Sequence, residues 1–274
     1  MNVLWVLAHP EQQSLNGSLF DEGLRALNEA GDAYLVSDLY AMKWKATVDR
    51  GDFTDEPDER LIVTAASRRA HLDGTLSADI RAEQEKLDWA DAVVLQFPLW
   101  WYGMPAILKG WFDRVFVKGF AYGVTDGDSG RSLRYGEGRL AGKRALVVVT
   151  AGSPEAALGL RGINGQLDHV LFPLLHGTLW YAGMSVLPPV AVYGADRVTQ
   201  QQYESATARL RDRVTSIRGT EPIPFRYQNG GEYDDALVLR PELAAGSTGL
   251  EVHYAAERRH GSRRSRNEVQ ASSR

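Results

Sequence analysis

The stretch QFPLWWYGMPAILKGWFDRVF, residues 96–116, joins an apolar run to a helical pattern through an aromatic loop. Residues 98–105 include two Pro and one Gly, which favours a loop, although loops usually lie at the surface, where exposed Trp is unfavourable. The preceding residues 91–98 are mostly apolar, as in strands that are buried on both faces of a parallel sheet. Residues 105–116 start with Pro and are apolar over a broad face, which predicts a helix that packs on that sheet.

The alternation of strands and helices continues in both directions along the chain. Four further strands are predicted at residues 2–9, 33–40, 143–153 and 186–194. Helices are predicted at residues 19–31, 64–72, 76–90, 165–183 and 199–217, with an interruption at Pro173. Five strands alternating with helices predict a doubly wound α/β fold. With the strand order 2-1-3-4-5, ligands are expected beside the loops at residues 9–18, 98–104 and 150–164.

The composition narrows the class of protein. The chain has 274 residues, a formal net charge of -4 and no Cys. The absence of Cys excludes disulfides, thiolate metal sites and a Cys nucleophile, and it suits a reducing cytoplasm. No basic surplus is present to neutralise phosphates, so we expect no nucleic-acid partner. No apolar run approaches the ~18 residues of a membrane-spanning helix, so we expect a cytoplasmic protein without membrane insertion.

The composition and the hydrophobic periodicity of the sequence change after the last predicted helix. We therefore expect residues 1–218 to form the α/β domain. Residues 219–255 are rich in Gly and Pro and have no long periodic segment. We expect them to form an irregular extension near the active site or a partner subunit. Residues 256–274 have several Arg and Ser and no apolar pattern, which predicts a disordered tail.

The first strand-to-helix loop carries polar groups suited to an anion. It lacks G-x-G-x-x-G and the P-loop pattern, but it contains His9, Ser14, Asn16 and Ser18 ahead of a helix. The free N–H groups and dipole of a helix N-terminus favour phosphate, and these side chains add donors. The alternative is plain helix capping by Asn16 or Ser18.

The aromatic loop also admits two interpretations. It could be a hydrophobic corner packed under a helix. It could instead form the wall and floor of a cofactor site, in which Trp101 and Tyr102 flank a flat ring and Gly103 lets the backbone approach closely.

Other candidate sites are weaker. The six His residues form no close metal-ligand cluster, so no metal site is predicted. His169 and His176 are expected to serve a core or interface role. The acidic stretch at Asp49, Asp52, Asp55, Glu56, Asp58 and Glu59 is interpreted as a solvated loop.

Several segments together resemble one known family. LAHPEQQSLN, SDLYAMKW, LSADIRAEQEKLDWAD, FPLWWYGMPAILKGWFDRVF and GFAYG closely resemble the NAD(P)H:quinone oxidoreductase family of flavodoxin-like flavoproteins, over residues 3–192. The resemblance implies a flavodoxin-like five-stranded parallel sheet, a bound flavin (FAD, with FMN possible) and a homodimer. It also implies two-electron hydride transfer by a ping-pong mechanism, from NADH or NADPH to a quinone or a small aromatic acceptor.

The resemblance also implies roles for individual positions. His9, Leu15, Asn16 and Ser18 would line the diphosphate and ribityl side of the flavin. Pro98, Leu99, Trp100, Trp101 and Tyr102 would cradle the isoalloxazine, and Thr150, Ala151, Gly152 and Ser153 would meet its pyrimidine edge. Gly152, Asn164 and Tyr122 are the expected catalytic residues. Trp101, Tyr102, Tyr122 and Tyr181 would contact the substrate, with Tyr122 reaching into the neighbouring subunit.

Four positions depart from the family pattern. Leu158 stands where the family has Tyr, Asn164 where it usually has His, and Val124 where it has a second Tyr. Trp100 replaces a common Gln. Leu cannot hydrogen-bond and Asn does not titrate near neutral pH, so the usual proton relay is lost. Backbone N–H groups around Gly152 could still offset charge on the flavin.

The departures keep two alternative functions open. One is a specialised reductase of a single aromatic metabolite, which the substituted relay positions favour. The other is a regulatory flavoprotein, since relatives of this fold serve as ancillary subunits of potassium-efflux systems. The extension after Ile217, which longer soluble reductases share, argues against the second alternative.

Overall fold

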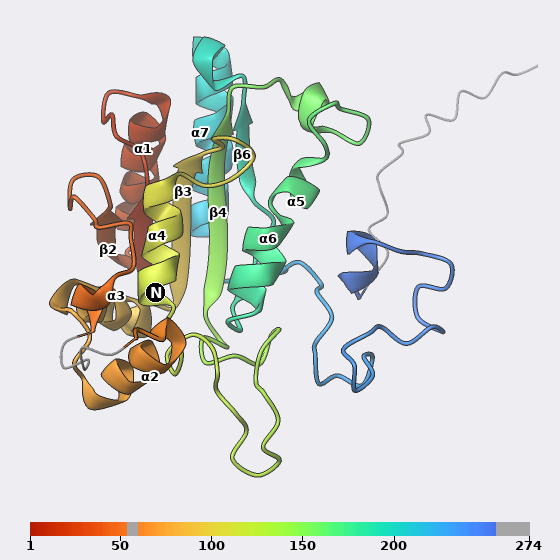
Figure 1. Ribbon diagram of the computed structural model, residues 1–274. Helices are drawn as coiled ribbons and strands as arrows, with labels where there is room; N and C mark the ends of the chain where they lie inside the picture. The colour runs from red at the N-terminus through yellow and green to blue at the C-terminus, as the bar shows by residue number, and fades with distance from the viewer. Residues whose placement is uncertain (54–59, 256–274) are drawn as a thin grey trace, which may run out of the picture.

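The computed structural model describes residues 1–53 and 60–255 (Figure 1). The strands are β1 (Asn2–Leu7), β2 (Ala33–Asp38), β3 (Ala92–Pro98), β4 (Arg144–Ala151), β5 (Ser185–Val186) and β6 (Val190–Tyr193). They form one parallel sheet in the order β2-β1-β3-β4-β5, with β6 also paired to β4. The predicted doubly wound fold and the order 2-1-3-4-5 are therefore confirmed. The predicted tail at residues 256–274 lies outside the described residues.

The fifth strand differs from its prediction. Residues 186–194 were expected to form one strand, but β5 and β6 are two short strands that pair with different parts of β4. Pro188 and Pro189 lie between them. Because Pro has no N–H to donate to a ladder, the pair interrupts the strand.

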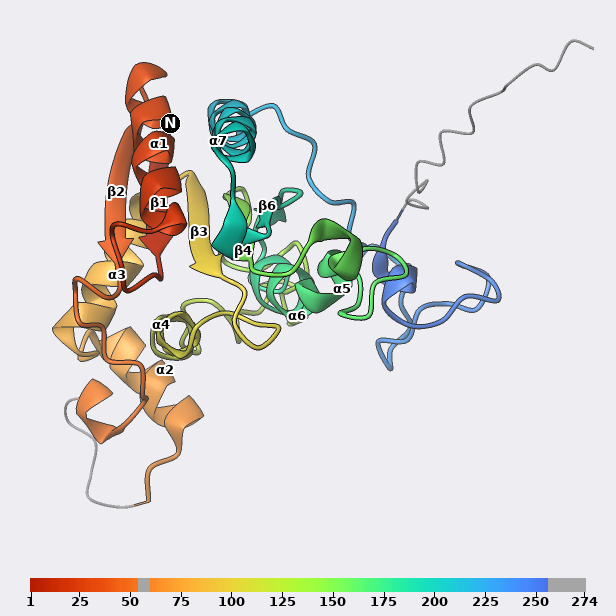
Figure 2. The same cartoon turned by 90° about the horizontal axis from the view of Figure 1, so that it is seen from above.

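Helices cover both faces of the sheet. They are α1 (Leu15–Glu29), α2 (Val63–Asp73), α3 (Ala78–Trp89), α4 (Ala106–Val115), α5 (Leu167–Val170), α6 (Phe172–Leu174) and α7 (Gln200–Thr215), with a π-helix η3 (Leu175–Trp180). Short 3-10 turns lie at η1 (Arg50–Asp52), η2 (Glu155–Leu158), η4 (Ala195–Arg197) and η5 (Leu250–His253). Figure 2 shows α1 and α7 on one face and α3, α4, α5 and α6 on the other. Among the described residues, no helix combines the length and the apolar character needed to cross a membrane.

The core has one apolar layer on each side of the sheet. Trp5 is fully buried on the side of α1 and α7, and its ring leaves no room for a side chain at Gly23 of α1. On the other side Trp111 of α4 is fully buried, and its Nε1 donates to the buried carboxylate of Glu83 at 2.8 Å. This close packing explains why α4 is apolar over a broad face.

One acidic residue corrects the interpretation of residues 49–59 as a solvated loop. Asp52 is 1% exposed and lies 2.8 Å from Nη2 of buried Arg114 and 2.9 Å from Nζ of Lys45. Buried carboxylates are stable when they are paired, and this pair fastens η1 to α4. Asp49 does lie at the surface, where it pairs with Lys45. Asp55, Glu56, Asp58 and Glu59 lie outside the described residues.

The predicted helix at residues 165–183 is divided into three pieces. The short α5 ends at Val170, α6 has Pro173 in its first turn, and η3 continues as a π-helix. Pro at the start of α6 has no N–H to lose, which explains why the break precedes it. The wider turn of η3 carries His176 into the core, where it is 8% exposed.

The extension at residues 219–255 first meets the edge of the sheet, where the N–H of Ile223 donates to the carbonyl oxygen of Val186 in β5 at 2.7 Å. It then runs beside α5 and α6 (Figures 1 and 2). Within this extension, Phe225 pairs with Tyr254 through backbone hydrogen bonding, and both are buried. Their rings approach Phe172 at centroid distances of 6.2 and 6.4 Å, so the extension closes over the helical pieces.

Because of His176, the stability of the fold should depend on pH. Burial, followed by the neighbouring His253, lowers the pKa of His176 from 6.5 to about 4. The unfolded chain binds a proton there below pH ~6.5, whereas the folded chain does not. Stability from this residue is therefore complete above pH ~6.5 and falls as the pH drops towards about 4.

Denaturant unfolding at two pH values can measure this effect. Between about pH 7.5 and 4.5, His176 should contribute a loss of roughly 2–3 kcal/mol to the free energy of unfolding. His176→Phe keeps a ring at the position and should show a correspondingly smaller loss. An unchanged pH dependence in that variant would show that His176 is not the group responsible.

Candidate flavin site

Four segments at the carboxyl ends of β1, β3, β4 and β6 enclose a cavity of about 390 Å³, here called the loop cavity. It is lined by His9, Ser14, Leu15, Asn16, Pro98, Leu99, Trp100, Thr150, Gly152, Ala195 and Asp196. Eight of the residues that sequence reasoning placed around a flavin thus lie together at the switch point of the sheet. Such a point is where doubly wound folds bind their ligands.

The start of α1 positions the first loop. Ser14 is the N-cap, and its Oγ accepts a hydrogen bond from the N–H of Gly17 at 3.1 Å. Capping by Asn16 or Ser18, the alternative considered above, is therefore wrong. Ser14 Oγ also lies 3.0 Å from Nδ1 of His9, so the cap and the histidine form one polar edge at the positive end of a 15-residue helix.

A buried chain of hydrogen bonds supports the floor of the loop cavity. Trp5 Nε1 donates to Gln96 Oε1 at 3.0 Å, and Gln96 Nε2 donates to the carbonyl oxygen of Asn16 at 2.7 Å. Asn16 Nδ2 then donates to Thr150 Oγ1 at 2.8 Å. The chain links β1, β3, α1 and β4, which fixes three of the lining loops relative to one another.

The aromatic loop makes a tight turn. Trp100 and Gly103 exchange two backbone hydrogen bonds of 3.0 Å, and the residues between them, Trp101 and Tyr102, have φ of 48° and 61°. Bulky residues rarely adopt this left-handed conformation, which costs roughly 1–3 kcal/mol each and is concentrated at functional sites. The turn leaves the Trp101 side chain 97% exposed.

A second hydrogen-bonded chain fastens this turn to the loop after β4. Tyr102 Oη donates to Asn164 Oδ1 at 3.0 Å, and Asn164 Nδ2 donates to Ser153 Oγ at 2.9 Å. The Asn164 side chain thus joins the aromatic loop to Ser153 in the loop after β4. Leu158, in contrast, is buried and offers no polar group.

Sequence reasoning missed Ala195 and Asp196. Both belong to η4, which follows the last strand, and a single exposed Asp-containing turn carries no recognisable signal. Asp196 faces Gly152 so closely that a Cβ on Gly152 would lie 2.8 Å from Asp196 Oδ2. The carboxylate adds an acceptor at the edge of the cavity.

Other predicted site residues lie outside the loop cavity. Ser18 is exposed on α1, and Trp101, Tyr102, Ala151 and Ser153 do not line the cavity. Tyr122 and Tyr181 line a separate hollow of about 370 Å³ between α4 and η3, here called the tyrosine hollow. Burial, and then the nearby Tyr181, raises the pKa of Tyr122, so its hydroxyl stays protonated at neutral pH.

The loop cavity fits a flavin better than a metal ion. Its wall combines apolar surface at Leu99 and Trp100 with donors at Asn16 and the N-terminus of α1, and Gly152 leaves room for close approach. Flat cofactors require this combination of apolar walls and few polar contacts. Within residues 1–53 and 60–255, no group of three His, Asp or Glu is arranged to hold a metal ion.

The sequence matches a protein family whose fold agrees with the observed one. A family model described as a flavodoxin-like fold matches residues 1–214. The match covers the whole sheet and all the lining residues of the loop cavity, and it ends in α7.

Individual proteins and a solved structure are also similar to this chain. A ribosyldihydronicotinamide dehydrogenase-like protein of Penicillium crustosum is 45% identical over 261 residues, which are 94% of this chain and 97% of that protein. NAD(P)H dehydrogenase [quinone] 1 of Rattus norvegicus is 36% identical over 81% of this chain and 79% of its own length. A solved structure from Klebsiella pneumoniae, provisionally named a quinone reductase, is 51% identical and superposes with a TM-score of 0.90. It covers 93% of this chain and 100% of its own.

Proposed function

The chain belongs to the flavodoxin-like fold family, and on this premise we propose that it is a flavin-dependent NAD(P)H oxidoreductase. In this proposal it transfers two electrons as a hydride to quinones or related aromatic acceptors by a ping-pong mechanism. The observation that supports the proposal most is the loop cavity, where eight residues expected around a flavin meet at the switch point. Relatives named as quinone dehydrogenases and quinone reductases support the acceptor class.

Each edge of the loop cavity would contact a different part of the flavin. The N-terminus of α1, with Ser14 and Asn16, would bind the ribityl and diphosphate side, because its N–H groups favour negative charge. Trp100 and the backbone of Leu99 would border the ring, and the N–H groups near Gly152 would bond its pyrimidine edge. A bound flavin supplies a ring that takes a hydride from a nicotinamide and returns it to an acceptor. FAD is the proposed flavin, with FMN as the alternative.

The Tyr102–Asn164–Ser153 chain would replace the family's usual relay. Asn164 cannot take up a proton, so it can orient Tyr102 and Ser153 but cannot carry charge. Fixed N–H dipoles near Gly152 would then offset developing negative charge on the ring. The catalytic roles of Gly152, Asn164 and Tyr122 form part of this proposal.

We also propose a homodimer. Tyr122 and Tyr181 line the tyrosine hollow rather than the loop cavity of their own chain, so they would serve the substrate site of a partner subunit. Trp101 and Ile163 are each 97% exposed near the loop cavity, and apolar side chains this exposed favour a covered surface. The same surface would let a quinone stack beside Trp101 and Tyr102.

Identification of the bound flavin tests the proposal. The purified protein should be yellow, and heat release followed by chromatography should yield FAD. Release of FMN would correct the identity of the flavin and leave the oxidoreductase proposal standing. A colourless protein that binds neither added flavin would contradict the proposal.

Trp100→Gln should change the range of substrates. The indole is 45% exposed at the rim of the loop cavity, so replacing it with a smaller amide opens the ring's edge. We expect KM to change roughly three- to tenfold for bulky acceptors, because the change in buried apolar surface is worth about 1 kcal/mol. Steady-state assays with small and large quinones measure this. Equal KM ratios in both proteins would exclude a role in selection.

A specialised reductase of one aromatic metabolite is the second candidate. The replacement of the relay positions by Leu158 and Asn164 favours it. Relatives named ribosyldihydronicotinamide dehydrogenases widen the choice of electron donor beyond NADH and NADPH. A panel of acceptors distinguishes the two, since a specialised enzyme would prefer one acceptor by orders of magnitude. A regulatory flavoprotein would instead copurify with membranes and turn over weakly.

A further inference from the structure

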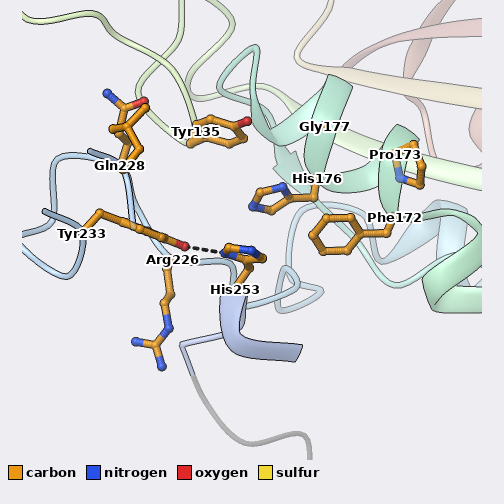
Figure 3. A pocket seen from close by; sticks show the side chains of 10 residues that line it. Tyr135, Phe172, Pro173, His176, Gly177, Arg226, Gln228, Tyr233 and His253 are labelled. Atoms are coloured by element: carbon orange, nitrogen blue, oxygen red, sulfur yellow. Dashed lines mark hydrogen bonds between the residues drawn. The ribbon is translucent and has the colours of Figure 1, made fainter. Parts of the chain in front are cut away.

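A second cavity, of about 340 Å³, lies between η3 and the C-terminal extension (Figure 3). It is called the extension cavity here and is lined by Tyr135, Phe172, Pro173, His176, Gly177, Arg226, Gln228, Tyr233, Leu237 and His253. It shares no residue with the loop cavity. Its volume lies at the lower end of the ~300–1,000 Å³ typical of small-molecule sites, which suits a ligand of one or two rings.

Ring side chains form most of its wall. Phe172 stacks on His176 with centroids 4.6 Å apart and planes 17° apart, and Tyr135 lies 5.0 Å from the same imidazole. His253 lies 5.4 Å from His176 and is nearly parallel to Tyr233. Figure 3 shows Tyr135, His176, His253 and Tyr233 arranged around one space. Walls of this kind favour an aromatic ligand.

Two polar groups in the wall lack partners. Within residues 1–53 and 60–255, neither ring nitrogen of His176 nor the hydroxyl of Tyr135 makes a hydrogen bond, although His176 is only 8% exposed. His253 differs, because its Nδ1 is hydrogen-bonded to Tyr233 Oη at 2.9 Å. Both His176 and Tyr135 line the cavity, so a ligand that supplies one hydroxyl can form hydrogen bonds with both of them.

The cavity carries little charge. Arg226 donates Nε to the carbonyl oxygen of Val252 at 2.9 Å and pairs with Glu232 through Nη1. Its guanidinium points away from the other labelled side chains in Figure 3. Among the described residues that line the cavity there is no Asp or Glu. Burial lowers the pKa of both His176 and His253, so both are neutral at pH 7.

We propose that the extension cavity binds uncharged aromatic alcohols, that is, phenols with one or two fused rings. The ligand hydroxyl would donate to a ring nitrogen of His176 and accept from Tyr135, while its ring packs between Tyr135 and Tyr233. This site is separate from the loop cavity and does not depend on a flavin being bound.

Calorimetric titration of the purified full-length protein at neutral pH tests the proposal with three probes. 2-Naphthol should bind, while naphthalene, which lacks the hydroxyl, and 2-naphthoate, which is an anion, should each bind about tenfold more weakly. Equal affinity for 2-naphthol and naphthalene would contradict the hydroxyl's role. Tighter binding of 2-naphthoate would contradict an uncharged site, and no binding of 2-naphthol would overturn the proposal.

Variants locate the bound probe. His176→Phe and Tyr135→Phe retain the rings and should each weaken 2-naphthol binding about five- to tenfold. Tyr227→Phe is the matched control, because Tyr227 is exposed and lies outside the cavity. Trp101→Ala should also leave the affinity unchanged. If Trp101→Ala weakens binding while His176→Phe does not, the probe lies beside the exposed aromatic turn rather than in the extension cavity, and the proposal fails, whatever the outcome for the flavin.

Discussion

Arg114→Met is expected to lower the free energy of unfolding by about 3–5 kcal/mol, the cost of leaving a buried charge without its partner. Both Arg114 and Asp52 have side chains 1% exposed, and Arg114 also donates to the carbonyl oxygen of Lys45 at 3.1 Å. Burial alone would lower the pKa of Arg114. The hydrogen bonds to Asp52 and Asp79 outweigh this effect of burial, so the pKa of Arg114 is raised. Removing the guanidinium leaves the buried carboxylate of Asp52 with the Lys45 ammonium and the N–H of Asp49 as partners.

Denaturant unfolding monitored by Trp fluorescence measures this loss. Lys109→Met is the matched control, because Lys109 lies on the same helix and pairs with Asp113 at the surface. Exposed pairs are worth about 0–1 kcal/mol, so the control should change little. The double variant with Asp52→Asn should lose less than Arg114→Met alone, since no carboxylate remains buried. Equal losses in Arg114→Met and Lys109→Met would contradict this account of the η1–α4 attachment.

Gly17→Ala is expected to weaken flavin binding roughly 10- to 100-fold, as overpacking of about 1–3 kcal/mol implies. A Cβ on Gly17 would lie 1.8 Å from the carbonyl oxygen of Gln12, which is part of the loop between β1 and α1. The backbone of that loop must therefore shift, and it carries Ser14 and His9 at the polar edge of the loop cavity. The displaced loop is also held to the end of β2, where Gln12 Nε2 donates to Asp38 Oδ2 at 2.8 Å, so the shift should move Ser14 and His9 relative to the other walls of the cavity.

Fluorescence titration of flavin-free protein with FAD measures this change. Gly219→Ala is the control, since a Cβ there meets no atom within 4 Å. The control should bind flavin as the unaltered protein does. Unchanged affinity in Gly17→Ala, in a protein that binds flavin, would show that the first loop does not contribute to the site.

The fold could be predicted from the sequence because long apolar runs alternate with helical patterns. The fifth strand was harder to predict. Its division into β5 and β6 depends on how the residues on either side of Pro188 and Pro189 pair with β4, and not on local propensity. The π-helical course of η3 likewise depends on tertiary packing around His176. Asp52 was misinterpreted because its partner, Arg114, is 62 residues away in the sequence.

The candidate site was predictable where loops follow strands. Positions such as Asn16, Pro98 and Thr150 meet because the carboxyl ends of parallel strands share one edge of the sheet. Asp196 escaped prediction because nothing in a short turn indicates which way its side chain points. Hydrogen bonds such as Tyr102 to Asn164 join distant loops, so only the three-dimensional arrangement reveals them.

Anaerobic stopped-flow mixing tests the central proposal most directly. We expect NADH, NADPH or dihydronicotinamide riboside to bleach the visible absorbance of the bound flavin, and a stoichiometric quinone to restore it in a second mixing step. If none of these donors bleaches the flavin while dithionite does, the proposed NAD(P)H oxidoreductase function is contradicted.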